Sequence, residues 1–94
     1  MAENQQTRLK KLHYRSWHRG CKETDVILGH FADSHLEGLS TAQLDVYERL
    51  LDEQDADIWN WLIGKELPTR QEYTPVIKLL RQFTTKQFKV AAEG

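Results

Sequence analysis

Apolar residues recur along this chain at spacings of three and four, with polar residues between them. That spacing places the apolar side chains on one face of an α-helix. No stretch alternates apolar and polar residues for long enough to predict a strand. Glycines and polar stretches divide the pattern into five short segments. The pattern therefore predicts an all-α fold, a compact five-helix bundle that forms a single small domain.

The first three predicted helices carry recognisable end signals. The first two cover about residues 8–17 and 24–35, and they are followed by Gly20 and Gly38, the residue type that most often ends a helix. The third begins after Ser40, which is followed three positions later by a glutamine. This arrangement is typical of a capping box, in which the two side chains satisfy free backbone N–H groups at the start of a helix.

The last two predicted helices are shorter or less regular in sequence. Either Asp55 or Asp57 is expected to cap a fourth helix, which Gly64 ends. A polar loop follows. Thr74 and Pro75 form a typical cap and first-position pair, so we expect the fifth helix to begin there.

The positions predicted to be buried share the apolar face of these helices. The helical core is expected to span about residues 8–83, with flexible ends at 1–7 and 84–94. The residues predicted to be buried are Leu12, Leu28, Phe31, Tyr47, Leu50, Leu51, Trp61, Leu62, Leu80 and Phe83.

Composition is compatible with one small domain. The chain has 94 residues, of which 39% are hydrophobic and 29% are charged. No apolar run approaches the roughly 20 residues that span a membrane, and the beginning, MAENQQTRLKK, lacks the apolar core of a secretory signal. The single cysteine, Cys21, excludes an internal disulfide and favours a reducing compartment, so the cytoplasm is expected.

The charges are unevenly distributed along the chain. Residues 1–23 carry six Lys or Arg against two acids (net +4), and residues 24–57 carry nine acids against one base (net −8). The remaining residues carry six bases against three acids (net +3). A basic first segment beside an acidic middle segment either serves solubility or marks one face for an acidic partner.

The basic first segment supports an alternative function, a small nucleic-acid-binding or antitoxin-like regulator. Tyr14 and Trp17 lie among its basic residues, as aromatic residues do in many nucleic-acid-binding surfaces. A pI of about 6.4 and the acidic middle segment argue against phosphate binding. The basic residues are Arg8, Lys10, Lys11, Arg15, Arg19 and Lys22.

The histidines and the cysteine do not form a recognisable ligand or catalytic set. His30 and His35 are five positions apart, which separates them by roughly 140° around a helix. His18 and Cys21 lie on either side of a glycine, and a Cys–His nucleophile pair would lack an orienting acid other than Glu23. We therefore expect no bound metal, no catalytic residues and no enzyme activity.

The break between the first two helices combines Arg19, Gly20 and Glu23. As structure alone, Gly20 ends a helix and Arg19 forms an exposed pair with Glu23, worth about 0.3–0.5 kcal/mol. As a functional surface, the same residues would contact a partner. Spacing alone leaves both interpretations open.

A family resemblance bears on this choice. The stretch from Arg19 to Glu23 resembles the RG-x-x-E signature of the SdhE-type succinate dehydrogenase assembly factors. The first two helices of that family resemble LHYRSWHRGCKETDVILGHFAD, the third and fourth resemble LSTAQLDVYERLLDEQDADIWNWL, and the last resembles TPVIKLLRQF. The resemblance covers about residues 8–83. The signature alone is weak, but it is specific when ERLLDEQDADIWNWL follows at this distance.

The resemblance implies a five-helix bundle and a dedicated chaperone. Such a protein binds the flavoprotein subunit of succinate dehydrogenase, and by extension that of fumarate reductase, and promotes covalent attachment of the FAD that this client carries. Arg19, Gly20 and Glu23 would then contact the client, with Gly20 allowing the two surfaces to approach closely. The residues expected at the rim by proximity are Arg15, His18 and Lys22.

Further expectations follow from the resemblance. The protein would have no cofactor of its own, would bind neither nucleic acid nor membrane, and would be a monomer when free. A helix that begins by residue 8 leaves no room for a transit peptide. We therefore expect the bacterial cytoplasm rather than the mitochondrial matrix.

Overall fold

The computed structural model describes residues 4–88 and contains helices and connecting turns in that range. The predicted all-α fold with five α-helices is confirmed. Two short 3₁₀ turns, Leu36–Gly38 and Gln71–Tyr73, lie before the third and fifth helices. The helices are α1 (Gln5–Trp17), α2 (Lys22–His35), α3 (Thr41–Leu51), α4 (Asp55–Leu62) and α5 (Thr74–Phe88).

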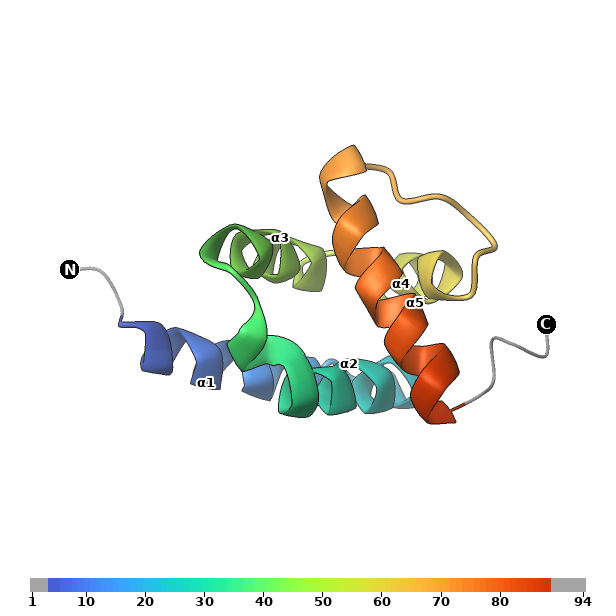
Figure 1. Cartoon of the computed structure of the whole chain (residues 1–94). Coiled ribbons are helices and arrows are strands. Elements are labelled where there is room, and N and C mark those ends of the chain that lie inside the picture. Colours follow the sequence, from blue (N-terminus) through green and yellow to red (C-terminus); the bar gives the residue numbers. More distant parts are fainter. Residues whose placement is uncertain (1–3, 89–94) are drawn as a thin grey trace.

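The helices pack in two layers (Figure 1). The first two helices, α1 and α2, run side by side in opposite directions and form one layer. The other layer contains α3 and α4, and α5 runs across the molecule from that layer to α2, so that it contacts α2, α3 and α4. The α1–α2 turn thereby lies near the α3–α4 turn, although more than thirty residues separate them in the sequence.

The core forms where the apolar faces of all five helices meet. Every residue that the helical spacing predicts to be buried is buried, and several of them, including Leu28, Phe31 and Tyr47, are fully inaccessible to solvent. These residues belong to one continuous hydrophobic cluster. The prediction of the core is therefore confirmed.

The ends of the described chain are more helical than expected. The first helix begins at Gln5 because the side chain of Asn4 accepts a hydrogen bond from the backbone N–H of Thr7 at 2.8 Å. The last helix continues to Phe88, past the predicted end at Phe83. These helices overlap the ends predicted to be flexible, at residues 5–7 and 84–88. Residues 1–3 and 89–94 lie outside the described residues.

One of the three predicted helix starts is confirmed. Ser40 and Gln43 form the capping box, with reciprocal bonds of 3.1 and 2.9 Å. Neither Asp55 nor Asp57 caps α4, because Gln54 occupies the cap position and Asp55 is the first helical residue. Thr74 is also the first residue of its helix, since the preceding 3₁₀ turn leads directly into α5.

The contact between α1 and α2 depends on a glycine. Gly29 on α2 is buried beneath the indole ring of Trp17 at the end of α1. A Cβ atom at position 29 would lie 2.2 Å from Cδ2 of that ring, far inside van der Waals contact. The absence of a side chain therefore lets the ring rest on the α2 backbone.

Replacing Gly29 with alanine should destabilise the fold by about 1–3 kcal/mol, because the indole ring must move to make room for the methyl group. Thermal unfolding followed by circular dichroism measures the effect. Gly38→Ala is the matched control, since a Cβ there meets no atom within 4 Å. Equal melting temperatures for Gly29→Ala and Gly38→Ala would contradict the proposed close contact.

Two buried tyrosines carry hydroxyl groups with defined partners. The Tyr47 hydroxyl lies 2.6 Å from that of Ser16, and Ser16 also donates to the carbonyl of Leu12 at 2.8 Å. The Tyr73 hydroxyl donates to the carboxylate of Glu53 at 2.6 Å. Burial raises the pKa of both phenols, and for Tyr73 the adjacent carboxylate raises it further, to about 12.

These raised pKa values predict a loss of stability at alkaline pH. The unfolded chain releases the phenolic protons near pH 10.0, whereas the folded protein keeps them to higher pH. Stability should therefore be unaffected by these groups below pH 10 and should fall as the pH rises toward 12. Denaturant unfolding at a series of pH values across this range gives the free energy of unfolding as a function of pH. This free energy should fall less steeply with pH in Tyr47→Phe and Tyr73→Phe than in the parent protein. Tyr14→Phe, which alters a ring that is 64% exposed, should keep the parent slope.

Candidate functional site

The α1–α2 turn requires a glycine for its backbone conformation. Gly20 has a φ of +103°, in the region that other residues rarely adopt. A Cβ atom built on Gly20 has no atom within 4 Å, so the space around it is open. Gly20 is therefore exposed at the surface, and nothing within the described chain crowds it.

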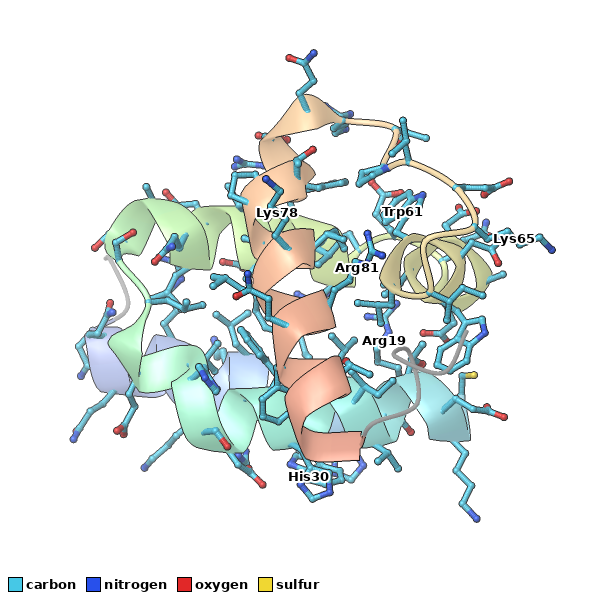
Figure 2. The ribbon with its side chains drawn as sticks, turned by 45° about the vertical axis from the view of Figure 1, so that its right-hand side comes forward. Arg19, His30, Trp61, Lys65, Lys78 and Arg81 are labelled. Carbon is cyan, nitrogen blue, oxygen red and sulfur yellow. The ribbon has the colours of Figure 1, made fainter. Side chains whose placement is uncertain are left out.

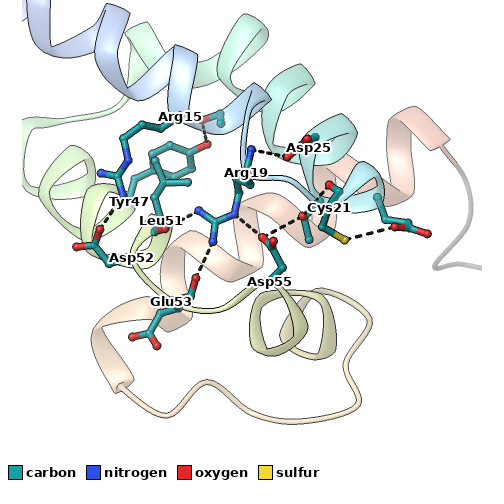
Figure 3. Close-up of polar contacts among 12 residues, drawn as sticks. Arg15, Arg19, Cys21, Asp25, Tyr47, Leu51, Asp52, Glu53 and Asp55 are labelled. Atoms are coloured by element: carbon teal, nitrogen blue, oxygen red, sulfur yellow. Dashed lines mark hydrogen bonds and ion pairs between the residues drawn. The ribbon is translucent and has the colours of Figure 1, made fainter.

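The side chain of Arg19 points into the molecule rather than toward solvent. Figure 2 shows it directed inward, whereas Lys65 extends away from the surface. Its three nitrogens donate to three acceptors, which lie at the end of α3, in the α3–α4 turn and at the start of α4 (Figure 3). The acceptors are the carbonyl of Leu51 at 2.5 Å, the carbonyl of Glu53 at 2.6 Å and the carboxylate of Asp55 at 2.6 Å.

Further hydrogen bonds hold the backbone of the same turn. The backbone N–H of Arg19 donates to the carboxylate of Asp25 at 2.8 Å. The buried hydroxyl of Thr24 lies 3.1 Å from the carbonyl of Cys21 and 3.2 Å from the carboxylate of Asp55. Asp55 thus contacts both sides of the turn, through Arg19 before Gly20 and through Thr24 after it.

The ion pair between Arg19 and Asp55 is largely withdrawn from water. The two side chains are 10% and 27% exposed. Removing one partner from a buried pair costs about 3–5 kcal/mol, and the partial exposure of Asp55 places this pair near the lower limit. The pair explains why Asp55 does not cap α4, since its carboxylate is already bound to another element.

The other predicted contact residues remain at the surface. Glu23 and Lys22 are exposed in the first turn of α2. The only bond recorded for the Glu23 carboxylate in residues 4–88 is a weak one from the thiol of Cys21, at 3.4 Å. The exposed Arg19–Glu23 pair considered from spacing does not form, because Arg19 is bound to Asp55. Of the signature residues, Gly20 and Glu23 are therefore accessible to a partner.

Two of the predicted rim residues border a shallow depression beside the turn. Arg15 pairs with Asp52 at 2.6 Å. His18 stacks on Tyr14 with ring centroids 4.2 Å apart, and Tyr14 is 64% exposed. The depression has a volume of 380 Å³ and is lined by Tyr14, Arg15, His18, Arg19, Leu51, Asp52 and Glu53.

Sequence analysis missed the structural role of Asp55 and Thr24. The run DEQDAD (residues 52–57) contains Asp55, but by itself it indicates only the start of a helix. The excess of acids in this segment, opposite an excess of bases in the first helix, was the evidence for pairing between the two. The individual partners depend on tertiary packing.

Arginines of the first segment pair with acids of the middle segment. Arg8 bonds to Asp45 and Glu48 on α3, at 2.6 and 2.9 Å, and its side chain is 18% exposed. Arg15 and Arg19 pair with acids that follow the end of α3. Because these charges are neutralised within the chain, they are poorly available to phosphate groups. The pairing therefore argues against the nucleic-acid-binding alternative.

Across residues 4–88, no three His, Cys, Asp or Glu side chains come together in a way that could hold a metal ion. Within the same range, no helix combines the length and the apolar composition needed to cross a membrane.

Comparison with known proteins identifies the family. A family model described as flavinator of succinate dehydrogenase matches residues 10–84, most of the chain. The chain belongs to this family. The predicted resemblance to succinate dehydrogenase assembly factors is thus confirmed, and the family is one of assembly factors rather than enzymes.

Curated relatives of this flavinator family have the same description, succinate dehydrogenase assembly factor 2, mitochondrial. The relative from Meyerozyma guilliermondii is 39% identical over 85 residues, which cover 86% of this chain and 63% of the relative. The relative from Dictyostelium discoideum is 44% identical over 73 residues, covering 77% and 51%. The relative from Yarrowia lipolytica is 36% identical over 85 residues, covering 86% and 59%. The chain therefore spans between about half and two thirds of the length of these relatives.

The relatives contradict the predicted localisation. We expected the bacterial cytoplasm, but the matching relatives are mitochondrial proteins of eukaryotes. The argument from the start of the first helix was wrong because the position of a helix in the chain does not determine the compartment.

The geometry of Gly20 predicts equal stability losses for two very different side chains. Gly20→Ala and Gly20→Arg should each lower stability by about 1 kcal/mol, because both place a Cβ on a backbone with positive φ and neither meets a neighbour. Chemical denaturation of the two variants measures this. A much larger loss for the arginine variant would show that the turn is crowded within the chain.

Proposed function

We propose that this chain binds the flavoprotein subunit of succinate dehydrogenase and promotes covalent attachment of FAD to that subunit. The observation that carries the proposal is the α1–α2 turn. It presents Gly20 and Glu23 at the surface on a backbone held by Arg19, in a family described as flavinators. An open glycine close in the chain to an exposed carboxylate suits close approach of a second protein surface.

The proposed mechanism is alignment of the client. In FAD attachment the client supplies both reacting groups, a histidine as nucleophile and the flavin 8α-methyl as electrophile. The remaining requirement is their relative orientation, which a rigid partner can provide by binding one client conformation more tightly than others. The chain therefore needs a fixed surface rather than a catalytic pocket, and the buried hydrogen bonds of Arg19 provide that rigidity.

Within this proposal, the signature residues have different roles. Gly20 allows the backbone to approach the client, and the Glu23 carboxylate accepts hydrogen bonds from it. Arg15, His18 and Lys22 lie next to them and supply the rim. Arg19 contributes mainly by holding the turn, because its guanidinium is already bound within the chain.

Two finer points belong to the same proposal. The resemblance to the SdhE-type factors extends the range of clients to the flavoprotein subunit of fumarate reductase.

A monomeric free protein is supported by the enclosed core, in which the predicted apolar residues are buried within one chain. Light scattering of the purified protein tests the second point, and binding to the fumarate reductase subunit tests the first.

The proposed docking surface predicts that binding losses at Gly20 depend on side-chain size. Gly20→Arg should weaken binding to the purified flavoprotein subunit at least about tenfold more than Gly20→Ala, because the longer side chain holds the surfaces apart. Covalent flavin, measured by fluorescence of the denatured subunit, should fall in parallel. Binding losses that simply follow the melting temperatures of the two variants would contradict the proposal.

Glu23 provides an independent test at an exposed position. Glu23→Ala should weaken client binding about tenfold through loss of a charge-assisted hydrogen bond, with little change in melting temperature. Glu37→Ala removes another exposed carboxylate, in the Leu36–Gly38 turn, and is the matched control. Equal binding by these two variants would remove Glu23 from the interface.

A further inference from the structure

The feature that carries a further inference is the carboxylate of Asp55, which lies outside the signature. We infer that Asp55 is a positioning residue for client docking: it orients the Arg19–Gly20 turn without touching the client. This inference rests on the proposed function, and it deepens that function by assigning a residue on a different helix to the same surface.

The Asp55 carboxylate lies within hydrogen-bond distance of both Arg19 and Thr24. Asp55 is the first residue of α4, and its Oδ1 accepts from Nε of Arg19 at 2.6 Å. The same oxygen lies 3.2 Å from the hydroxyl of Thr24, which is fully buried at the start of α2. One carboxylate oxygen therefore ties α4 to residues on both sides of Gly20.

Without the Asp55 carboxylate, the guanidinium of Arg19 would lose its charged partner. The carbonyls of Leu51 and Glu53 would still accept from Arg19, but they carry no full charge to balance the guanidinium. A cation that is only 10% exposed would then favour rotation into water. Because Gly20 gives the adjoining backbone unusual freedom, that rotation would release the turn.

The backbone of the α1–α2 turn makes few other hydrogen bonds. Its backbone is tied to α2 by the bond from the N–H of Arg19 to Asp25, at 2.8 Å. That bond holds the turn to the helix that follows it, but not to the other layer of the molecule. The turn is connected to the α3–α4 region through Arg19 and Thr24, and Asp55 accepts from both and is the charged partner of Arg19. The Arg15–Asp52 pair holds the end of α1, rather than the turn itself, to the same region.

Asp55→Ala is the direct test, and Asp57→Ala is its matched control. Both acids lie in the first turn of α4, so both variants lose a similar interaction with the helix dipole, whereas Arg19 bonds to Asp55 and not to Asp57. We expect Asp55→Ala to weaken binding to the flavoprotein subunit about tenfold or more and Asp57→Ala to change it less than about twofold. Binding should be measured well below each melting temperature, where circular dichroism shows the variants folded.

Amide hydrogen exchange of the free protein separates positioning from general destabilisation. In Asp55→Ala the N–H of Arg19 should exchange at least about tenfold faster, because the turn opens more often. The N–H of Leu44, bonded to the carbonyl of Ser40 in the capping box of α3, should keep its rate. Unchanged exchange at Arg19, or equal acceleration at both amides, would overturn the inference.

A double-variant cycle tests whether Asp55 acts through Arg19. The binding losses of Asp55→Ala and Arg19→Ala should be strongly non-additive. The double variant should bind the flavoprotein subunit as tightly as whichever single variant has the lower affinity. Additive losses would mean that the two residues act separately, which contradicts the inference. If Asp55→Ala does not fold, Asp55→Asn replaces it, because the amide keeps an oxygen that can accept from Arg19. Asp55→Asn should then bind the flavoprotein subunit more weakly than the parent protein does, while retaining part of the affinity.

The outcomes distinguish this inference from the function on which it rests. If the parent protein does not bind the flavoprotein subunit, both are wrong. If the parent binds and Gly20→Arg does not, while Asp55→Ala binds normally, the docking surface is retained and the positioning role of Asp55 is rejected.

Discussion

The structure of this small bundle depends on how Arg19 is bound. Its guanidinium joins the α1–α2 turn to the end of α3 and the beginning of α4, two regions brought together only by folding. Each donor nitrogen has an acceptor, and Asp55 supplies the balancing charge. This arrangement turns a short loop with a flexible glycine into a fixed part of the surface, because an unsatisfied guanidinium at this depth would be unstable.

The same principle explains the uneven charge of the chain. The basic first segment and the acidic middle segment are complementary parts of one fold, joined by ion pairs at Arg8, Arg15 and Arg19. The exposed pair of Arg15 adds little to stability. The pairs of Arg8 and Arg19 hold α1 against α3 and the α1–α2 turn against α4. The three arginines of a segment that looks like a nucleic-acid-binding surface in the sequence are therefore committed to internal contacts.

The residues of the RG-x-x-E signature do not all face the same way in the structure. Arg19, Gly20 and Glu23 are close in sequence, yet the arginine faces inward while the other two face solvent. On the function proposed above, the chain needs both an exposed contact surface and a means of keeping that surface in place. A local sequence motif can encode the exposed surface and also the arginine that holds it. Asp55, the charged partner of that arginine, lies on another helix.

The sequence by itself determined the helices, the buried face of each and the capping box at Ser40, because these features depend on residues within one or two turns of one another. It also indicated the family, through the order and spacing of several helical segments. Tertiary structure decided the direction of Arg19, the role of Asp55 and the packing of Trp17 on Gly29. A side chain with several local options takes the one that burial and distant acceptors favour, and only the assembled fold supplies those acceptors.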